Sequence, residues 1–150
     1  MPLKAAPLSP DGTQVVAQRS SRGRVSGLAV FDVVSGELLA TLGGLCPWEP
    51  EQFAFITPAD CGDCSTVADA TDLAWSPDGR RMASSDLSGV VRIWDPDTAE
   101  ELRVFEDLSG SIAWDLAWSP DGSRLAVAAE GGHMVVWEAD SGKVVWSTRD

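Results

Sequence analysis

Hydrophobic and polar residues alternate in short runs along most of the chain, and tight turns separate the runs. Leu73 and Trp75 share one face of DLAW, residues 90–94 (VVRIW) are β-branched and aromatic, and residues 101–105 alternate charged with apolar side chains. Alternation with a period of two is typical of a half-buried strand, and β-branched and aromatic residues fit a packed, pleated surface. The pattern therefore predicts four short strands, at residues 72–75, 82–85, 90–94 and 101–105.

The same pattern returns 43 residues further along the chain, and a weaker copy opens it. A fixed period of this length is characteristic of a repeat architecture. In the third copy the expected strands lie at 116–118, 125–129, 134–137 and 144–146, and in the first at 13–18, 25–33 and 37–42. The signature positions are Ser9, Pro10, Asp11, Gly12, Phe31 and Asp32; Ser76, Pro77, Asp78, Gly79, Trp94 and Asp95; and Ser119, Pro120, Asp121, Gly122, Trp137 and Glu138.

The period divides the chain into one repeat domain, residues 1–150, with units at about 3–42, 71–108 and 113–150. The first unit is predicted to be an end piece, because its opening strand contains Pro2 and Pro7 and proline is tolerated mainly at sheet edges. Residues 19–24 (RSSRGR) are expected to form a polar, basic loop. An insertion at about 43–70 separates the first two units, and long loops of this kind are often functional or disordered.

The Ser-Pro-Asp-Gly turns explain three aspartates without any catalytic role. Proline presets φ, aspartate bonds the nearby backbone, and glycine accepts a positive φ. Asp11, Asp78 and Asp121 occupy the same turn in different units. They are therefore interpreted as turn formers and not as paired general acids and bases.

Four strands per unit, the 43-residue period, the Ser-Pro-Asp-Gly turn and Ile93-Trp94-Asp95 together resemble WD40 repeats. The resemblance covers the second and third units well, over about 75 residues, and the first unit only in outline. It implies an all-β fold in which each unit is one blade of a β-propeller, giving three four-stranded antiparallel sheets. It also implies a non-catalytic protein–protein interaction module or scaffold that binds a protein or peptide.

The chain departs from the family pattern at two positions of a buried bond network. The Gly-His pair of the family corresponds to Leu108-Ser109, and the aspartate that pairs with that histidine corresponds to Ser88. The Asp-His-Ser-Trp network is therefore expected to be absent. Apolar packing by tryptophan would replace it, through Trp75, Trp94, Trp118 and Trp137.

Three blades are fewer than the four to eight that close a propeller, so two end faces would remain uncovered. Val135, Val144 and Val145 are expected to be such uncovered apolar residues at the last blade. Either the chain is a segment of a longer protein with neighbouring blades, or copies of it assemble into a ring. A homo-dimer would have six blades and a trimer nine.

The charge of the chain limits its partners. The formal net charge of −12 argues against nucleic acid, since phosphate binding depends on Lys and Arg. No apolar run approaches the roughly 20 residues that span a bilayer, and the first residues lack the apolar core of a signal peptide. The default expectation is a cytoplasmic protein without a membrane partner.

Three cysteines lie in the insertion, at Cys46, Cys61 and Cys64. A Cys-x-x-Cys pair can hold one Zn²⁺, but a structural site needs four ligands and a second pair is missing. His133, Asp60 or Asp63 could complete the set, although nothing in the sequence places them there. A metal- or redox-responsive module, a disulfide within the insertion and ordinary free thiols therefore all stay open. No cofactor is expected.

Candidate partner-binding residues lie mainly in the loops. Aromatic side chains on a loop held by rigid sheets can anchor a partner, or simply cover a blade. His133, the single histidine, begins a strand and is expected to be exposed or at an edge. No Gly-x-Ser-x-Gly elbow or Walker loop occurs, so no enzyme is expected. The candidates are Trp48, Phe53, Phe55, Arg22, Arg24 and His133.

Overall fold

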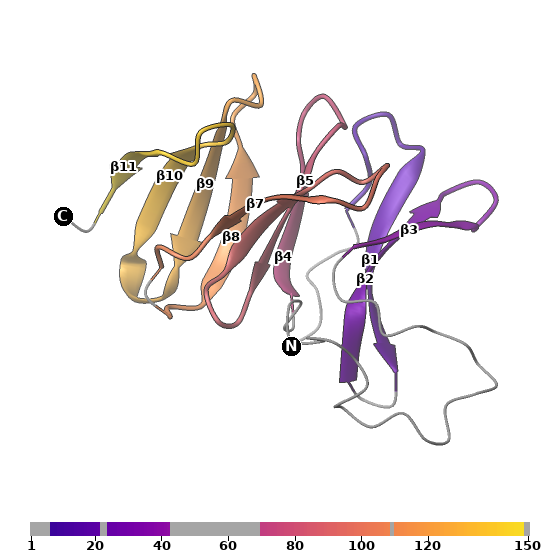
Figure 1. The fold of residues 1–150 in the computed structure, drawn as a ribbon, viewed down its shortest axis with the longest axis horizontal. Helices are drawn as coiled ribbons and strands as arrows, with labels where there is room; N and C mark the ends of the chain where they lie inside the picture. The colour runs from indigo at the N-terminus through magenta and orange to yellow at the C-terminus, as the bar shows by residue number, and fades with distance from the viewer. Residues whose placement is uncertain (1–6, 22–23, 43–69, 109, 149–150) are drawn as a thin grey trace.

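Three antiparallel sheets lie side by side in a computed structural model that describes residues 7–21, 24–42, 70–108 and 110–148 (Figure 1). In each sheet the strands pair with their neighbours in the chain, as a simple meander. Blade 1 comprises β1 (Gln14–Ser21), β2 (Arg24–Asp32) and β3 (Leu38–Leu42). Blade 2 comprises β4 (Ala70–Trp75), β5 (Met82–Asp86), β6 (Val91–Trp94) and β7 (Glu101–Phe105), and blade 3 comprises β8 (Ala113–Trp118), β9 (Arg124–Ala129), β10 (Met134–Glu138) and β11 (Val144–Ser147).

The predicted all-β class and the antiparallel meanders are confirmed. Blades 2 and 3 have four strands each, while blade 1 has three named strands and an isolated bridge between Leu8 and Val15 at its open edge. The bridge stands where a fourth strand was expected. Pro7 lies next to it, and a proline has no N–H with which to extend a ladder.

Alternation along the strands gives blade 2 two buried faces. Val91 and Ile93 of β6 pack in the cluster shared with blade 3, whereas Trp94 packs in the cluster shared with blade 1. Successive side chains of a strand point to opposite faces, so one short strand can serve both cores. Phe105 and Trp137 stack across the interface of blades 2 and 3 with their ring centroids 4.5 Å apart. Burial between adjacent sheets, and not within one sheet, therefore holds the fold together.

The predicted turn chemistry of the repeats is confirmed. Asp78 Oδ1 accepts bonds from Ser76 Oγ at 2.6 Å and from the Arg80 backbone N–H at 3.0 Å, and Gly79 has a φ of +70°. The equivalent bonds recur at Asp121 and at Asp11. These bonds hold the pKa of each carboxyl below its usual value, and that of Asp121 falls to about 2, with the Ser119 hydroxyl as the largest cause.

Two expectations about local structure were wrong. Residues 19–24 are not simply a loop, because β1 continues to Ser21 and β2 begins at Arg24, with a register shift between Arg19 and Ser20. The extra residues of blade 1 lengthen a hairpin, whose ladder satisfies the backbone of these polar residues. Val135 is also not uncovered: it is buried against blade 2, because its side chain alternates with the outward-facing Met134.

Candidate interaction surfaces

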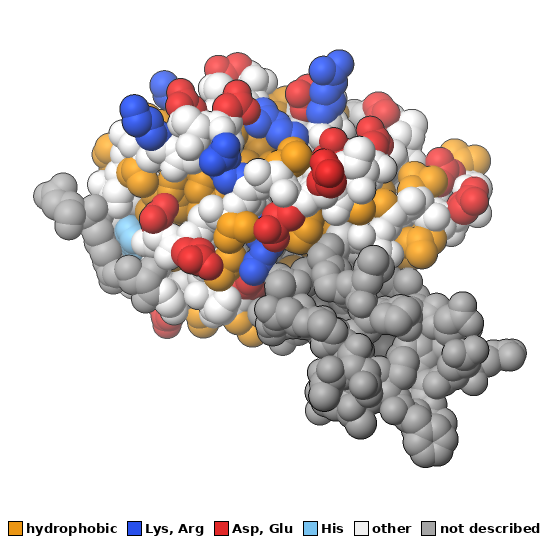
Figure 2. Space-filling model, viewed as in Figure 1, with side chains coloured by type: hydrophobic (Ala, Val, Ile, Leu, Met, Phe, Trp, Pro, Cys, Tyr) orange, Lys and Arg blue, Asp and Glu red, His pale blue; other side chains and the backbone are white. Residues whose placement is uncertain are grey.

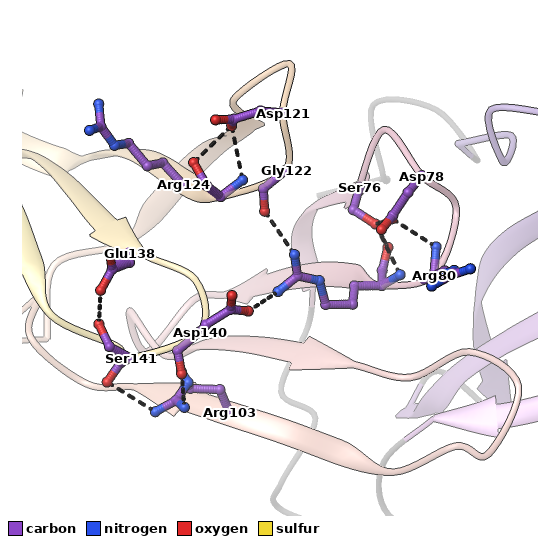
Figure 3. A network of polar contacts seen from close by, with 12 residues as sticks. Ser76, Asp78, Arg80, Arg103, Asp121, Gly122, Arg124, Glu138, Asp140 and Ser141 are labelled. Atoms are coloured by element: carbon purple, nitrogen blue, oxygen red, sulfur yellow. Dashed lines mark hydrogen bonds and ion pairs between the residues drawn. The ribbon is translucent and has the colours of Figure 1, made fainter.

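Each blade has a face toward the preceding blade, called here the leading face, and a face toward the following one, called the trailing face. Blade 2 binds the leading face of blade 3 through Arg81. Its guanidinium donates to the Gly122 carbonyl and to Asp140 Oδ1, both at 2.8 Å, and Figure 3 marks both bonds with dashed lines. It also lies 5.0 Å from the ring centroid of Trp118. One arginine thus engages two turns and an aromatic ring of the next blade.

Tryptophan makes the reciprocal contact in the opposite direction. Trp118 Nε1 of blade 3 donates to the Ala74 carbonyl of blade 2 at 3.0 Å. Trp75 Nε1 of blade 2 makes the equivalent bond to the Pro7 carbonyl at 3.1 Å. An indole N–H that ends the first strand of a blade therefore bonds the blade before it at both interfaces.

Near the first strands of blades 2 and 3, polar side chains cross the same interface. Asp72 Oδ2 accepts a bond from the Leu116 N–H at 2.8 Å, and Thr71 Oγ1 donates to the Ala113 carbonyl. Burial raises the pKa of Asp72, the neighbouring Asp115 carboxyl adds to this effect, and the backbone bonds oppose it. The protonated form of Asp72 is therefore favoured here relative to a carboxyl in water.

A groove of about 520 Å³ lies on the outer rim between blades 2 and 3. It runs from Arg103 of β7 past the end of that strand to Asp107, and reaches Ser141 and Gly142 of blade 3. Arg103 donates across it to the carbonyls of Asp140 and Ser141 (Figure 3), so part of its polar lining is already bonded. Figure 2 shows acidic and basic side chains interspersed over this side of the molecule, without one large patch of a single sign.

The trailing face of blade 3 has no following blade among the described residues, and it is apolar. Met134 is 43% exposed and Trp146 51%, while Val136, which pairs with Trp146, is half-buried. Val144 and Val145 of β11 are 51% and 48% exposed, which confirms the prediction that these two valines are uncovered. An end face that the repeat pattern would cover is therefore open.

The leading face of blade 1 is also open at described positions. Leu8 is 56% exposed and Leu38 44%, and Phe31, which takes the place of Trp94, is half-buried. Among the described residues, apolar side chains are thus exposed at both ends of the row of sheets that Figure 1 shows.

Most of the predicted loop sites lie outside the described residues. These are Arg22, the aromatic residues Trp48, Phe53 and Phe55, and the cysteines Cys46, Cys61 and Cys64. Arg24 begins β2, and only its backbone is described. Within the described ranges no three His, Cys, Asp or Glu side chains group as a metal site would require, and no helix there could cross a membrane.

His133 was expected to be exposed or at an edge, and this was wrong. Only 5% of it is exposed, and its Nε2 lies 3.3 Å from Ser147 Oγ, beneath the last strand. Alternation explains the burial, since His133 has the same parity as the buried Val135 and Trp137. A partner could reach this ring only if β11 moved.

The predicted loss of the buried bond network is partial. Trp94 Nε1 still donates to Ser84 Oγ at 2.9 Å. In blade 3 the equivalent Trp137 Nε1 instead donates to Asp107 Oδ2 at 3.0 Å, across the interface with blade 2. Asp86 is buried and accepts bonds from Ser88, Val90 and Arg92. A local turn network at Asp86 therefore stands beside the retained Ser-Trp bond.

Stacked antiparallel meanders with tryptophan between neighbouring sheets define blades of the β-propeller type. Two sequence-family models match the chain: one described as "WD domain, G-beta repeat" over residues 62–95, and one described as "Anaphase-promoting complex subunit 4 WD40 domain" over residues 103–149. A comparison with curated proteins found no match. The chain belongs to the WD40-repeat family. WD40 repeats generally mediate protein–protein interaction and are generally non-catalytic.

Arg81, which joins blades 2 and 3, and its repeat counterpart Arg124 were not predicted from the sequence. Arg81 and Arg124 follow their Ser-Pro-Asp-Gly turns at the same offset, 43 residues apart. This equivalence was visible in the repeat. The contact that Arg81 makes with the next blade could not be predicted, because from the sequence a basic residue after a turn is expected to be a solvated surface residue. Only the neighbouring sheet shows what it bonds.

Proposed function

We propose that this chain is a non-catalytic interaction module that binds protein through the uncovered end faces of its blades. The observation that carries the proposal is the trailing face of blade 3, where Met134 and Trp146 are about half exposed beside Val136. Exposed apolar side chains gathered on one rigid face are typical of protein-binding surfaces, and tryptophan is enriched among residues that dominate binding energy. The general role of WD40 repeats supports the same conclusion.

Site-specific photo-crosslinking of the full chain tests this proposal. A crosslinking residue at position 146 should capture a protein that mass spectrometry can identify, and the additional substitution Met134→Asp should abolish the capture. A crosslinker at Thr98, in the exposed turn between β6 and β7, is the control. Capture of the same proteins from both positions, or capture that survives Met134→Asp, would contradict the proposal.

Two other sequence hypotheses stay predictions. Closure into a dimer or trimer would appear in native mass spectrometry as a discrete species that Met134→Asp disperses. A metal- or redox-responsive role for Cys46, Cys61 and Cys64 would appear as bound zinc, or as a mass loss of two hydrogens on disulfide formation. The loop residues Trp48, Phe53 and Phe55 likewise stay candidate contacts.

A further inference from the structure

Blade 3 repeats on its uncovered trailing face the positions that blade 2 uses to bind blade 3. Each residue of blade 2 corresponds to the residue 43 positions later in blade 3, with no insertion or deletion between the two units. Val91 and Ile93 are buried at 0% and 1% exposure because blade 3 covers them, whereas their counterparts Met134 and Val136 lack such a cover. The equivalent pairs are Ala74 and Ala117, Arg81 and Arg124, Ala83 and Ala126, Val91 and Met134, and Ile93 and Val136.

Arg124 shows that this correspondence extends to polar groups. Arg81 finds a carbonyl, a carboxylate and an indole ring on the blade that follows it. None of the hydrogen bonds or ion pairs among the described residues uses the Arg124 guanidinium, and Figure 3 shows its side chain extending away from the contacts of Arg103 and Asp140. The face therefore carries a cation in the position of one that is bonded in the preceding repeat.

The internal interface also defines what would cover this face. Among the groups that blade 3 presents to blade 2 are the Trp118 indole, the Gly122 carbonyl and the Asp140 carboxylate. The indole ends the first strand of its blade, and the carboxylate lies in the turn between the third and fourth strands. A partner with the same two side chains could bond both the Ala117 carbonyl and Arg124 of the open face.

We propose that the trailing face of blade 3 binds a β-blade that carries a tryptophan at the end of its first strand and an acidic residue in the turn before its last strand. The inference rests on the proposed function and names the partner chemistry of the same surface. Met134 and Val136 supply the apolar contact, while Arg124 selects the acidic turn. Continuity with the interface of blades 2 and 3 is the physical basis.

A second copy of this chain fits the face less well. Its blade 1 has Leu8 where blades 2 and 3 have tryptophan, immediately before the Ser-Pro-Asp-Gly turn. It has Val34 where blade 3 has Asp140, two residues before a glycine of positive φ in both turns. Blade 1 therefore offers apolar cover and the Gly12 carbonyl, but neither the indole N–H nor the carboxylate. Arg124 would remain without its acidic partner.

This difference gives a test that needs no identified partner. Leu8→Trp and Val34→Asp, introduced together in the full chain, give blade 1 the two missing groups. Both sites tolerate substitution because Leu8 is 56% exposed and Val34 93%. Sedimentation equilibrium of the double variant should show head-to-tail association about tenfold tighter than in the natural chain, because the added indole N–H bond, the contact of the indole ring with Arg124 and the solvent-screened ion pair act together.

Adding Arg124→Ala to the double variant should remove most of that gain, whereas adding Arg80→Ala, another exposed arginine beside a turn, should not. Association that is unchanged in the double variant, or a gain that survives Arg124→Ala, would overturn the inference. So would a natural chain that already forms a tight ring through Met134, since blade 1 as it stands would then be the occupant. These outcomes concern this chain alone, so they leave the photo-crosslinking test of the interaction function independent.

Discussion

Replacing Arg81 and Arg124 separately by methionine compares one repeat position in a covered and an uncovered blade. Arg81→Met removes a bond to the Gly122 carbonyl, an ion pair with Asp140 and a cation–π contact with Trp118. Arg124→Met removes no described side-chain bond. Methionine keeps much of the apolar stem of arginine, so the difference between the two variants reports mainly on the guanidinium contacts across the interface.

The magnitude follows from the exposure of each contact. The bond to the Gly122 carbonyl is part-buried and contributes about 1 kcal/mol. The ion pair is discounted to at most about 0.5 kcal/mol, because the Asp140 side chain is 84% exposed and water screens it. The cation–π contact at 5.0 Å adds about 0.5–1 kcal/mol. These terms are not fully additive, and Arg81→Met should therefore lower the free energy of unfolding by about 1–2 kcal/mol, against at most about 0.5 kcal/mol for Arg124→Met.

Urea unfolding followed by tryptophan fluorescence measures both values in the isolated chain. The expected result is a lower midpoint for Arg81→Met and an unchanged midpoint for Arg124→Met. Equal losses in the two variants would refute the reasoning, because they would mean that contact with the next blade does not distinguish the positions. A changed slope in one variant alone would refute it as well, since the surface exposed on unfolding would then differ.

Three further predictions concern the interface and the turns. Trp137→Ala should lower the free energy of unfolding by about 3–5 kcal/mol, because the Trp137 ring is fully buried. Trp146→Ala should lower it by about 1 kcal/mol or less, because Trp146 is 51% exposed. The denaturation midpoints of the two variants measure this difference. Because the pKa of Asp72 is raised in the folded chain, the Asp72 carboxyl lowers the stability of the fold as the pH rises from about 3.8 through that raised pKa. The variant Asp72→Asn should therefore be more stable than the natural chain at pH 7, by less than about 1 kcal/mol, and no more stable below pH 3.8. Unfolding measured at several pH values would show this difference. The pKa of Asp121 is lowered to about 2, so the effect of this carboxylate on stability is opposite: it stabilises the fold above pH 3.8, and the stabilisation disappears as the pH falls toward 2. Asp121→Asn should therefore flatten the acid side of the curve of stability against pH. An unchanged curve would contradict the role of Asp121 in its turn.

Arg103 and Trp146 occupy the same repeat position and have different consequences. Arg103 spans the rim between blades 2 and 3 through the carbonyls of Asp140 and Ser141. Trp146 instead presents an aromatic ring at the end of the row of sheets, beside Val136. At the position where a following blade would make contact, blade 3 thus has an apolar side chain and blade 2 a charged one. This difference agrees with an interaction role for the trailing face of blade 3.

Local chemistry was sufficient for much of the fold. The Ser-Pro-Asp-Gly turns form because proline, aspartate and glycine each meet a requirement of the turn itself, and Asp78 bonds only to neighbours within two residues. Strand positions followed from period-two alternation, as for Leu73 and Trp75. These features depend on residues close together in the chain, so the sequence carries them in full.

Local chemistry was not sufficient to predict the longer hairpin of blade 1 or the burial of His133 and Val135. A run such as RSSRGR has the composition of a loop, and only the pairing of β1 with β2 shows that most of it extends a ladder. His133 reads as a polar edge residue until β11 and its Ser147 cover it. In both cases a second strand, supplied by a different part of the chain, decided the outcome.

The sequence by itself determined the repeat, its strands, its turns and the WD40 class, because these depend on period, alternation and local bonding. Only the tertiary structure decided which faces are covered, which of two equivalent arginines is bonded, and which of the apolar residues of β10 and β11 remain exposed. Coverage depends on whether another sheet lies about 10 Å away, and two repeats with the same local pattern can differ in that respect. Arg81 and Arg124 differ in their surroundings for this reason alone.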